Sequence, residues 1–262
     1  MWRDLIGPLA EHYRVICPDF RGLGWSDAPP SGYSLSRQTA DLIGLLDELG
    51  LERVRVVGHD WGLVVSFWMC LHHPERLEQH IGMAGPHIWA ASGTPPRAYM
   101  RPWHILLLAS PLGQLAVRRF GLPEHALRTW RHLGSFTPDE MEIYLAPFRR
   151  PGAAKATAQR YWHLVGDLLW FLRHYRRLRV SVPTLHLVGE NDPIIETRPN
   201  RYLQTHADDF IYETVPEAGH FFVEERPDWV RARLLEYFAA DRAQSRGRSG
   251  ERSGASPAAA RS

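Results

Sequence analysis

An aspartate flanked by glycines, a second aspartate in a turn and a histidine in a loop are the residues of this chain best suited to chemistry. Asp60 is the centre of G-H-D-W-G (58–62), which directly follows the β-branched run at 54–57. Such a run is typical of a buried parallel strand. Glycines beside a polar residue permit a sharp strand-to-helix turn that exposes the middle side chain. The pattern therefore predicts Asp60 as a presented nucleophile; an aspartate in an ordinary turn or at a helix N-cap is the alternative.

A carboxylate at that position favours displacement at a saturated carbon. Attack on an ester or amide carbonyl would give a reactive anhydride, whereas attack on an epoxide or alkyl halide leaves an ordinary alkyl ester on the protein. No serine occupies the centre of the turn, and Ser66 falls within a helical pattern. Serine-esterase chemistry is therefore disfavoured.

Two residues downstream complete a set that could cleave such an ester. Asp192 lies in the turn after the strand-like run 184–189, and His220 lies in the loop A-G-H-F after the run 210–215. An aspartate can hold an imidazole in the tautomer that accepts a proton from water. Glu190 is the alternative acid, and a surface or core position is the alternative for His220.

The elements that must position these residues alternate between strand and helix patterns, which predicts a mostly parallel, doubly wound α/β sheet. Strands are expected at 13–17, 54–57, 79–84, 184–189 and 210–215, and helices at 35–49 and 63–73. Residues 86–181 show helical patterns rich in Trp, Pro and Arg, which predict a helical cap inserted into the core. The expected domains are core at 1–85, cap at 86–181, core again at 182–240, and a disordered tail at 241–262, where Ser, Arg, Gly and Ala follow no period.

Four motifs together resemble the epoxide-hydrolase and haloalkane-dehalogenase branch of the α/β-hydrolase fold, over residues 1–240. They are P-D-F-R-G-L-G-W-S-D (18–27), the turn around Asp60, G-E-N-D-P (189–193) and A-G-H-F (218–221). They follow the order nucleophile, acid, histidine that the fold requires. The resemblance implies an α/β-hydrolase core with a helical cap and a catalytic triad of Asp60, Asp192 and His220. It implies no metal and no organic cofactor.

The cap is expected to supply the proton that a departing epoxide oxygen needs. The segment A-Q-R-Y-W resembles the family's second cap segment and places Tyr161 at the tyrosine position, although a packing role is the alternative. The first cap segment matches P-W-H-I, with His104 where tyrosine is usual, and Tyr99 is another donor nearby. Trp61, beside the nucleophile, could donate an N–H to a halide, so haloalkane dehalogenation stays open as an alternative.

The beginning of the chain departs from the family pattern. The family's oxyanion loop, H-G-x-P, and the first three core strands have no counterpart in this sequence. We therefore expect an N-terminally truncated core: either the true start lies upstream, or the chain is a non-catalytic hydrolase-like protein or fragment. Residues 13–17 would have to pair directly with 54–57 or leave an edge exposed, so the chain as given is expected to be poorly soluble or marginally stable.

Composition excludes several other classes. A chain of 262 residues suits one large domain, and a net charge of +2 gives no reason to expect nucleic acid. No apolar run approaches the roughly 20 residues of a membrane span, and the start M-W-R-D lacks the features of a signal peptide. Cys17 and Cys70 are expected to be buried free thiols in a reducing compartment, which favours a cytoplasmic protein. The expected partner is a small hydrophobic substrate, and a homodimer is compatible with the sequence.

Overall fold

The computed structural model describes residues 1–90, 103–134, 136–195 and 201–253, and it contains a four-stranded sheet in the order β1-β2-β3-β4. All three neighbouring pairs run parallel. This arrangement confirms the predicted α/β class. The strands are β1 (Val54–His59), β2 (Leu77–Met83), β3 (Thr184–Gly189) and β4 (Phe210–Val215).

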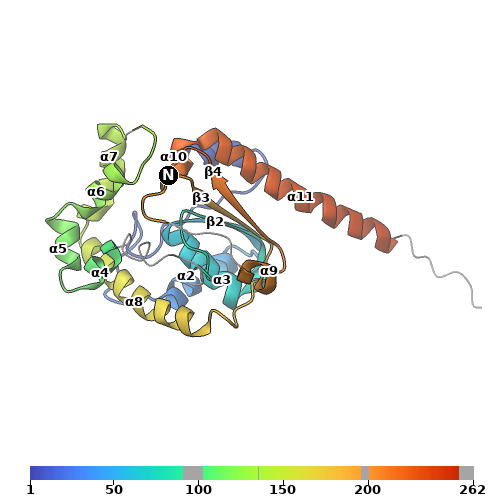
Figure 1. The fold of residues 1–262 in the computed structure, drawn as a ribbon, viewed down its shortest axis with the longest axis horizontal. Coiled ribbons are helices and arrows are strands. Elements are labelled where there is room, and N and C mark those ends of the chain that lie inside the picture. Colours follow the sequence, from blue (N-terminus) through green and yellow to red (C-terminus); the bar gives the residue numbers. More distant parts are fainter. Residues whose placement is uncertain (91–102, 135, 196–200, 254–262) are drawn as a thin grey trace, which may run out of the picture.

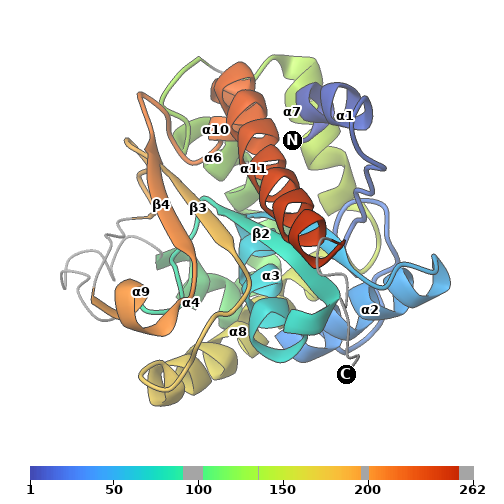
Figure 2. The ribbon, with the colours of Figure 1, turned by 90° about the vertical axis from the view of Figure 1, so that its right-hand side faces the viewer.

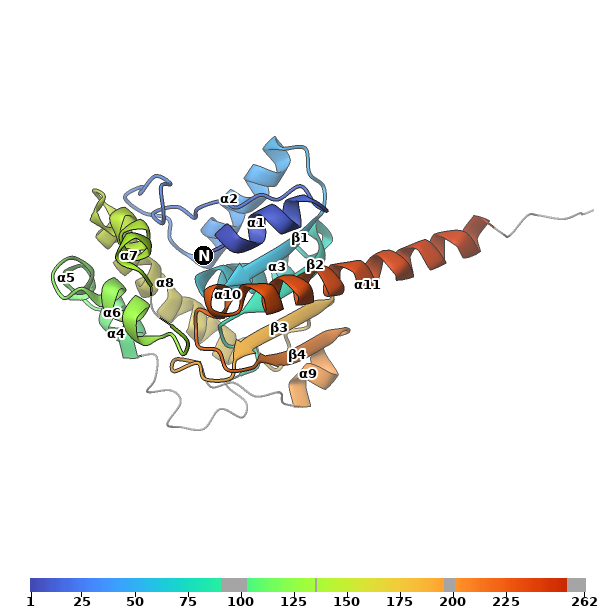
Figure 3. The same ribbon diagram turned by 90° about the horizontal axis from the view of Figure 1, so that it is seen from above.

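Helices cover both faces of the sheet (Figures 2 and 3). The core helices are α1 (Arg3–Ala10), α2 (Leu35–Glu48), α3 (Trp61–His72), α9 (Arg201–His206), α10 (Phe222–Glu225) and α11 (Pro227–Ser253), with a 3-10 turn at Pro74–Arg76. Figure 2 shows α11 crossing one face, with α1 beside its start, while α3 lies on the opposite face.

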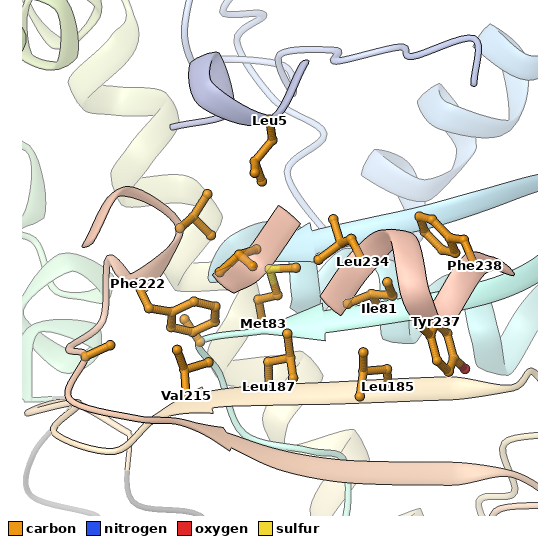
Figure 4. Packing of buried hydrophobic residues seen from close by; sticks show 14 residues of the cluster. Leu5, Ile81, Met83, Leu185, Leu187, Val215, Phe222, Leu234, Tyr237 and Phe238 are labelled. Carbon is orange, nitrogen blue, oxygen red and sulfur yellow. The ribbon is translucent and has the colours of Figure 1, made fainter. Parts of the chain in front are cut away.

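The core under α11 is formed by alternate side chains of the strands. Ile81 and Met83 from β2 and Leu185 and Leu187 from β3 point the same way because successive strand residues face opposite sides. They meet Leu234 of α11 and its neighbours, as Figure 4 shows. A second cluster on the other face joins α3 to the sheet and to α9. The strands that carry the site are therefore held from both sides.

Between β2 and β3 the described chain contributes helices that gather at one end of the sheet (Figure 1). They are α4 (Trp103–Ala109), α5 (Gly113–Arg118), α6 (Leu122–Thr129), α7 (Pro138–Leu145), a 3-10 turn at Ala146–Arg149, and α8 (Ala153–His174). A capping box closes the start of α7, where Thr137 and Glu140 exchange hydrogen bonds. We call these helices the cap; its predicted limits at residues 86 and 181 stay predictions.

The predicted strand at residues 13–17 is wrong. This segment has no regular secondary structure and no ladder partner, and within the described chain β1 pairs with β2 alone. A cavity of about 590 Å³ lies between the segment and β1, and both line it. Strands pair only when they lie about 4.8 Å apart, so a gap of this size leaves the segment outside the sheet. Consequently Cys17 is exposed, whereas Cys70 is buried as expected.

The predicted tail at residues 241–262 begins within helix α11, and its disorder stays a prediction. Helix α11 runs through residue 241 and ends at Ser253, and residues 254–262 lie outside the described part. Buried contacts of Val230, Leu234 and Phe238 fix the beginning of this helix. Extending an existing helix costs little compared with starting one, so the helix continues into a sequence with no apolar period.

Candidate active site

The turn between β1 and α3 presents Asp60 in a strained conformation. Asp60 has φ +50° and ψ −110°, a combination that non-glycine residues avoid. Its N–H donates to the carbonyl of Met83 at 2.9 Å, which ties the turn to β2. A Cβ atom at Gly58 would lie 2.4 Å from the Gly62 carbonyl oxygen, whereas one at Gly62 would meet nothing within 4 Å. The first glycine is therefore required by close packing, and Asp60 itself takes the left-handed turn.

Asp192 and His220 form a buried hydrogen-bonded pair. The Nδ1 atom of His220 lies 2.8 Å from Oδ2 of Asp192, whose side chain is inaccessible to solvent. The other oxygen, Oδ1, accepts the backbone N–H groups of Ile194 at 2.8 Å and Ile195 at 2.9 Å. The N–H of Asn191 donates to the carbonyl of Ala218 at 2.9 Å, which joins the two loops. Asp192 is thus fully hydrogen-bonded and its orientation is fixed.

The free nitrogen of His220 faces Asp60. Its Nε2 atom lies 3.8 Å from Oδ1 of Asp60, an ion-pair distance that is too long for a hydrogen bond. Nε2 is buried and has no hydrogen-bond partner among the described residues. The side chain of Asp60 is 53% exposed because it faces the cavity along β1. That cavity opens Asp60 to solvent from the side of residues 13–20, and neither His220 nor a described residue of the cap lines it.

The charges of these groups depend on one another. Desolvation raises the pKa of Asp60, but the nearby His220 cation outweighs it, so the pKa ends below its usual value. Burial lowers the pKa of His220, whereas the hydrogen bond and charge of Asp192, together with the charge of Asp60, raise it to about 10. The resting site therefore pairs an Asp60 carboxylate with a His220 imidazolium.

The alternative acid, Glu190, does not face the histidine. Its Oε2 accepts the backbone N–H of Glu217 at 2.9 Å, and the residue is exposed. His59, which precedes the nucleophile, supports the histidine loop instead: its Nε2 lies 2.8 Å from the carbonyl oxygen of His220. Burial and the charge of His220 lower the pKa of His59 to about 4, so it stays neutral and donates this bond.

Successive ring contacts line the site on the side of the cap. The ring centroids are 5.4 Å apart for Trp61 and Tyr161, 6.1 Å for Tyr161 and His104, 4.7 Å for His104 and Trp130, and 5.5 Å for Trp130 and His220. The structure therefore brings together all six site residues proposed from the sequence. Tyr99, the other proposed donor, lies outside the described residues.

Tyr161 and His104 both remain able to donate a proton or a hydrogen bond. Burial and the charge of Asp60 raise the pKa of Tyr161, so its phenol stays protonated. Burial lowers the pKa of His104, against the opposing charge of Asp60, and its Nδ1 atom is buried without a partner in the described chain. His104 therefore brings an unsatisfied buried nitrogen to the cap side of the site, beside the phenol of Tyr161.

The indole of Trp61 is already engaged. Its Nε1–H donates to Oε1 of Gln38 at 3.0 Å, and Gln38 in turn donates to the carbonyl of Tyr33 at 2.9 Å. The buried guanidinium of Arg160 lies 5.5 Å from the Trp61 ring. In this arrangement the indole N–H is not available to a halide at the nucleophile.

Sequence reasoning missed four residues that shape the site. Trp130 lies between His104 and His220, Gln38 orients Trp61, His59 supports the histidine loop, and Glu225 contacts that loop. His59 adjoins the nucleophile in the motif and could have been considered on position alone. Trp130 lies far from the motifs along the chain, and Glu225 follows A-G-H-F by only four residues, but no local pattern marks Trp130, Gln38 or Glu225.

The described residues contain no group of three or more His, Cys, Asp or Glu side chains arranged to hold a metal ion. Helices long and apolar enough to cross a membrane are likewise absent from the described part.

The fold and the site define a class of protein, and comparison with known families agrees. Residues 1–233 match the alpha/beta hydrolase family, and the chain belongs to it. Within this family its similarity is to epoxide hydrolases.

Epoxide hydrolase A of Mycobacterium tuberculosis is 29% identical over 90% of this chain and 85% of its own length. The soluble epoxide hydrolase of a Corynebacterium species is 26% identical over 91% of this chain and 85% of its own length. The crystal structure of epoxide hydrolase A from Mycobacterium thermoresistibile superposes with a TM-score of 0.74 at 26% identity, covering 90% of this chain and 86% of that one.

Proposed function

We propose that this protein hydrolyses an epoxide through a covalent ester on Asp60. The observation that carries the proposal is a carboxylate at the strained turn, with an imidazolium 3.8 Å away and a protonated phenol on the cap side. The similarity to epoxide hydrolases supports the same substrate class. The aromatic rings around the site favour a small hydrophobic epoxide.

In the first step, a carboxylate oxygen of Asp60 bonds to an epoxide carbon while the ring C–O bond breaks. The oxygen leaves as an alkoxide and takes a proton from Tyr161 or His104, which would stand within reach of it. The product of this step is a β-hydroxyalkyl ester of Asp60, which is neutral.

The second step follows from the loss of that charge. The negative charge of Asp60 helps to raise the pKa of His220, so forming the ester lowers the pKa again and makes the imidazole a better base. The imidazolium first gives up its proton, which replaces the proton that the cap donor lost in the first step. The neutral His220 then removes a proton from water, and the hydroxide attacks the ester carbonyl carbon. Asp192 stabilises the imidazolium that forms, and the backbone N–H of Trp61 at the start of α3 can donate to the oxyanion. Collapse of the resulting tetrahedral intermediate passes its hydroxyl proton to the departing alkoxide. This releases a diol and restores the carboxylate of Asp60.

Haloalkane dehalogenation is the second candidate from the sequence, and the engaged indole of Trp61 speaks against it. A halide departs without needing a proton, so the proton donors of the cap would also have no role. Comparing turnover of styrene oxide and 1-bromobutane distinguishes the two activities. Tyr161→Phe should slow styrene oxide opening about a hundred-fold or more; equal slowing of both substrates would assign Tyr161 to packing.

Trapping the ester tests the two-step scheme. His220→Gln should still be alkylated by styrene oxide but should fail to release the diol, so intact-mass spectrometry should find the protein heavier by one styrene oxide, with the label on the peptide that contains Asp60. Asp60→Asn should remain unmodified. An unmodified His220→Gln protein, together with a wild-type protein that forms no diol, would point to a non-catalytic member of the family.

A further inference from the structure

One carboxylate oxygen links the cap to the histidine loop. Glu225, the last residue of α10, is half-buried, and its Oε2 accepts three backbone N–H groups. Two come from the cap, His132 at 3.0 Å and Leu133 at 2.7 Å, and the third is Gly219 at 3.1 Å, directly before His220. A charged acceptor strengthens such bonds relative to a neutral one.

The cap segment 130–133 lies directly on the histidine loop. The N–H of His220 donates to the carbonyl of Trp130 at 2.8 Å. A Cβ atom at Gly219 would lie only 2.6 Å from the backbone nitrogen of His132. The two backbones therefore touch without a side chain between them, and Glu225 satisfies the donors on both sides of this contact.

The position of segment 130–133 decides what covers the reacting imidazole. Trp130 stacks edge-on against His220 and also contacts His104, with centroid distances of 5.5 and 4.7 Å. If the segment moved away, the indole would leave both rings, and bulk water would reach the buried face of His220. The loop that carries His220 would at the same time lose the hydrogen bond from the His220 N–H to the Trp130 carbonyl and the ring contact with the Trp130 indole.

We propose that Glu225 is a positioning residue: it fastens segment 130–133 to the loop of His220 and so holds the Trp130 indole over the imidazole. The proposal rests on the proposed function for its kinetic consequences. Glu225 touches neither Asp60 nor the space in front of it, so it acts through His220. A displacement of about 1 Å can slow a reaction about a hundred-fold. Ester hydrolysis, which needs His220 as a base, should therefore suffer more than ester formation, which needs Asp60.

The test compares Glu225→Gln and Glu225→Ala with wild type, using styrene oxide. Glu217→Gln is the matched control: it removes an exposed carboxylate of the same loop whose side chain pairs with Arg226. The measurements are kcat and KM for diol formation, the steady-state fraction of esterified protein by intact-mass spectrometry, and amide hydrogen exchange at residues 132, 133 and 219. Circular dichroism and a thermal melt establish that each variant folds.

Glu225→Ala should lower kcat at least ten-fold and lower KM in parallel, because slower ester hydrolysis reduces both. It should also raise the ester fraction and speed exchange at all three amides at least ten-fold. Glu225→Gln, which keeps one acceptor oxygen, should fall between Ala and wild type, and Glu217→Gln should match wild type. Unchanged exchange at residues 132 and 133 in a folded Glu225→Ala protein would overturn the proposal, as would an unchanged ester fraction beside a lowered kcat. If wild type forms no ester, the proposed function fails, and the amide exchange still decides the role of Glu225.

Discussion

Neutralising Asp60 should weaken the proton affinity of His220, and the structure sets the size of the effect. The two side chains lie 3.8 Å apart. Coulomb's law gives about 1 kcal/mol for unit charges at this distance in water and about 4 kcal/mol at an effective dielectric constant of 20. Because the side chain of Asp60 is 53% exposed, solvent screening places the effect between these limits. The proton affinity of His220 should fall about six-fold to about a thousand-fold.

Asp60→Asn produces this change without altering the shape of the side chain. Long-range proton–nitrogen NMR spectra of the labelled protein, recorded over a pH series, follow each imidazole. Comparison with His220→Gln assigns the His220 signals among the 14 histidines. The His220 transition should move to lower pH in Asp60→Asn, yet the hydrogen bond to Asp192 should keep the pKa of His220 above that of a free histidine.

Asp208→Asn is the control, because Asp208 forms an exposed ion pair with Arg179 and precedes β4, whereas the loop of His220 follows the other end of that strand. It should leave the His220 transition unchanged. If His220 titrated at the same pH in wild type and Asp60→Asn, the coupling between nucleophile and base would be refuted. Ester formation on Asp60 would then not activate His220.

Other substitutions probe the scaffold. Gly58→Ala should abolish activity and lower the melting temperature because its Cβ would meet a carbonyl oxygen, whereas Gly62→Ala should be tolerated. Leu185→Ala should lower the free energy of unfolding in urea by about 2–5 kcal/mol, and Ile211→Ala, at a site 37% exposed, by clearly less. Because folding raises the pKa of His220, its protonation stabilises the protein below about pH 6.5. That contribution should vanish as pH rises through about 10, so urea titrations of wild type and His220→Gln should converge there.

The parts of the fold that could be predicted are those with a strong local pattern. The run at 54–57 and the glycine-flanked turn predicted β1 and α3, and β3 and β4 were found within the expected ranges, because buried parallel strands consist of short apolar runs. Residues 13–17 have the same kind of pattern but form no strand. Strand formation needs a neighbour at pairing distance, and that condition cannot be read from the segment itself.

The residues of the candidate site likewise divide into those that a local motif marks and those that depend on tertiary contacts. Asp60, Asp192 and His220 are recognisable because each follows a strand in a characteristic motif. Trp130 and Glu225 reach the site through the tertiary contact between the cap and the histidine loop. Their neighbours along the chain carry no sign of that contact, since it is formed by backbone groups that every residue possesses.

The left-handed conformation of Asp60 separates what selection for stability favours from what selection for activity favours. A side chain held at φ +50° and ψ −110° costs about 1–3 kcal/mol, and glycine would relieve that cost at the same position. A library of this gene sorted only for heat resistance should therefore accumulate inactive Asp60→Gly proteins. Asp60 should persist only while survival depends on the reaction. In heat-resistant lineages selected without substrate, Asp60 should be the first residue of the site to be replaced.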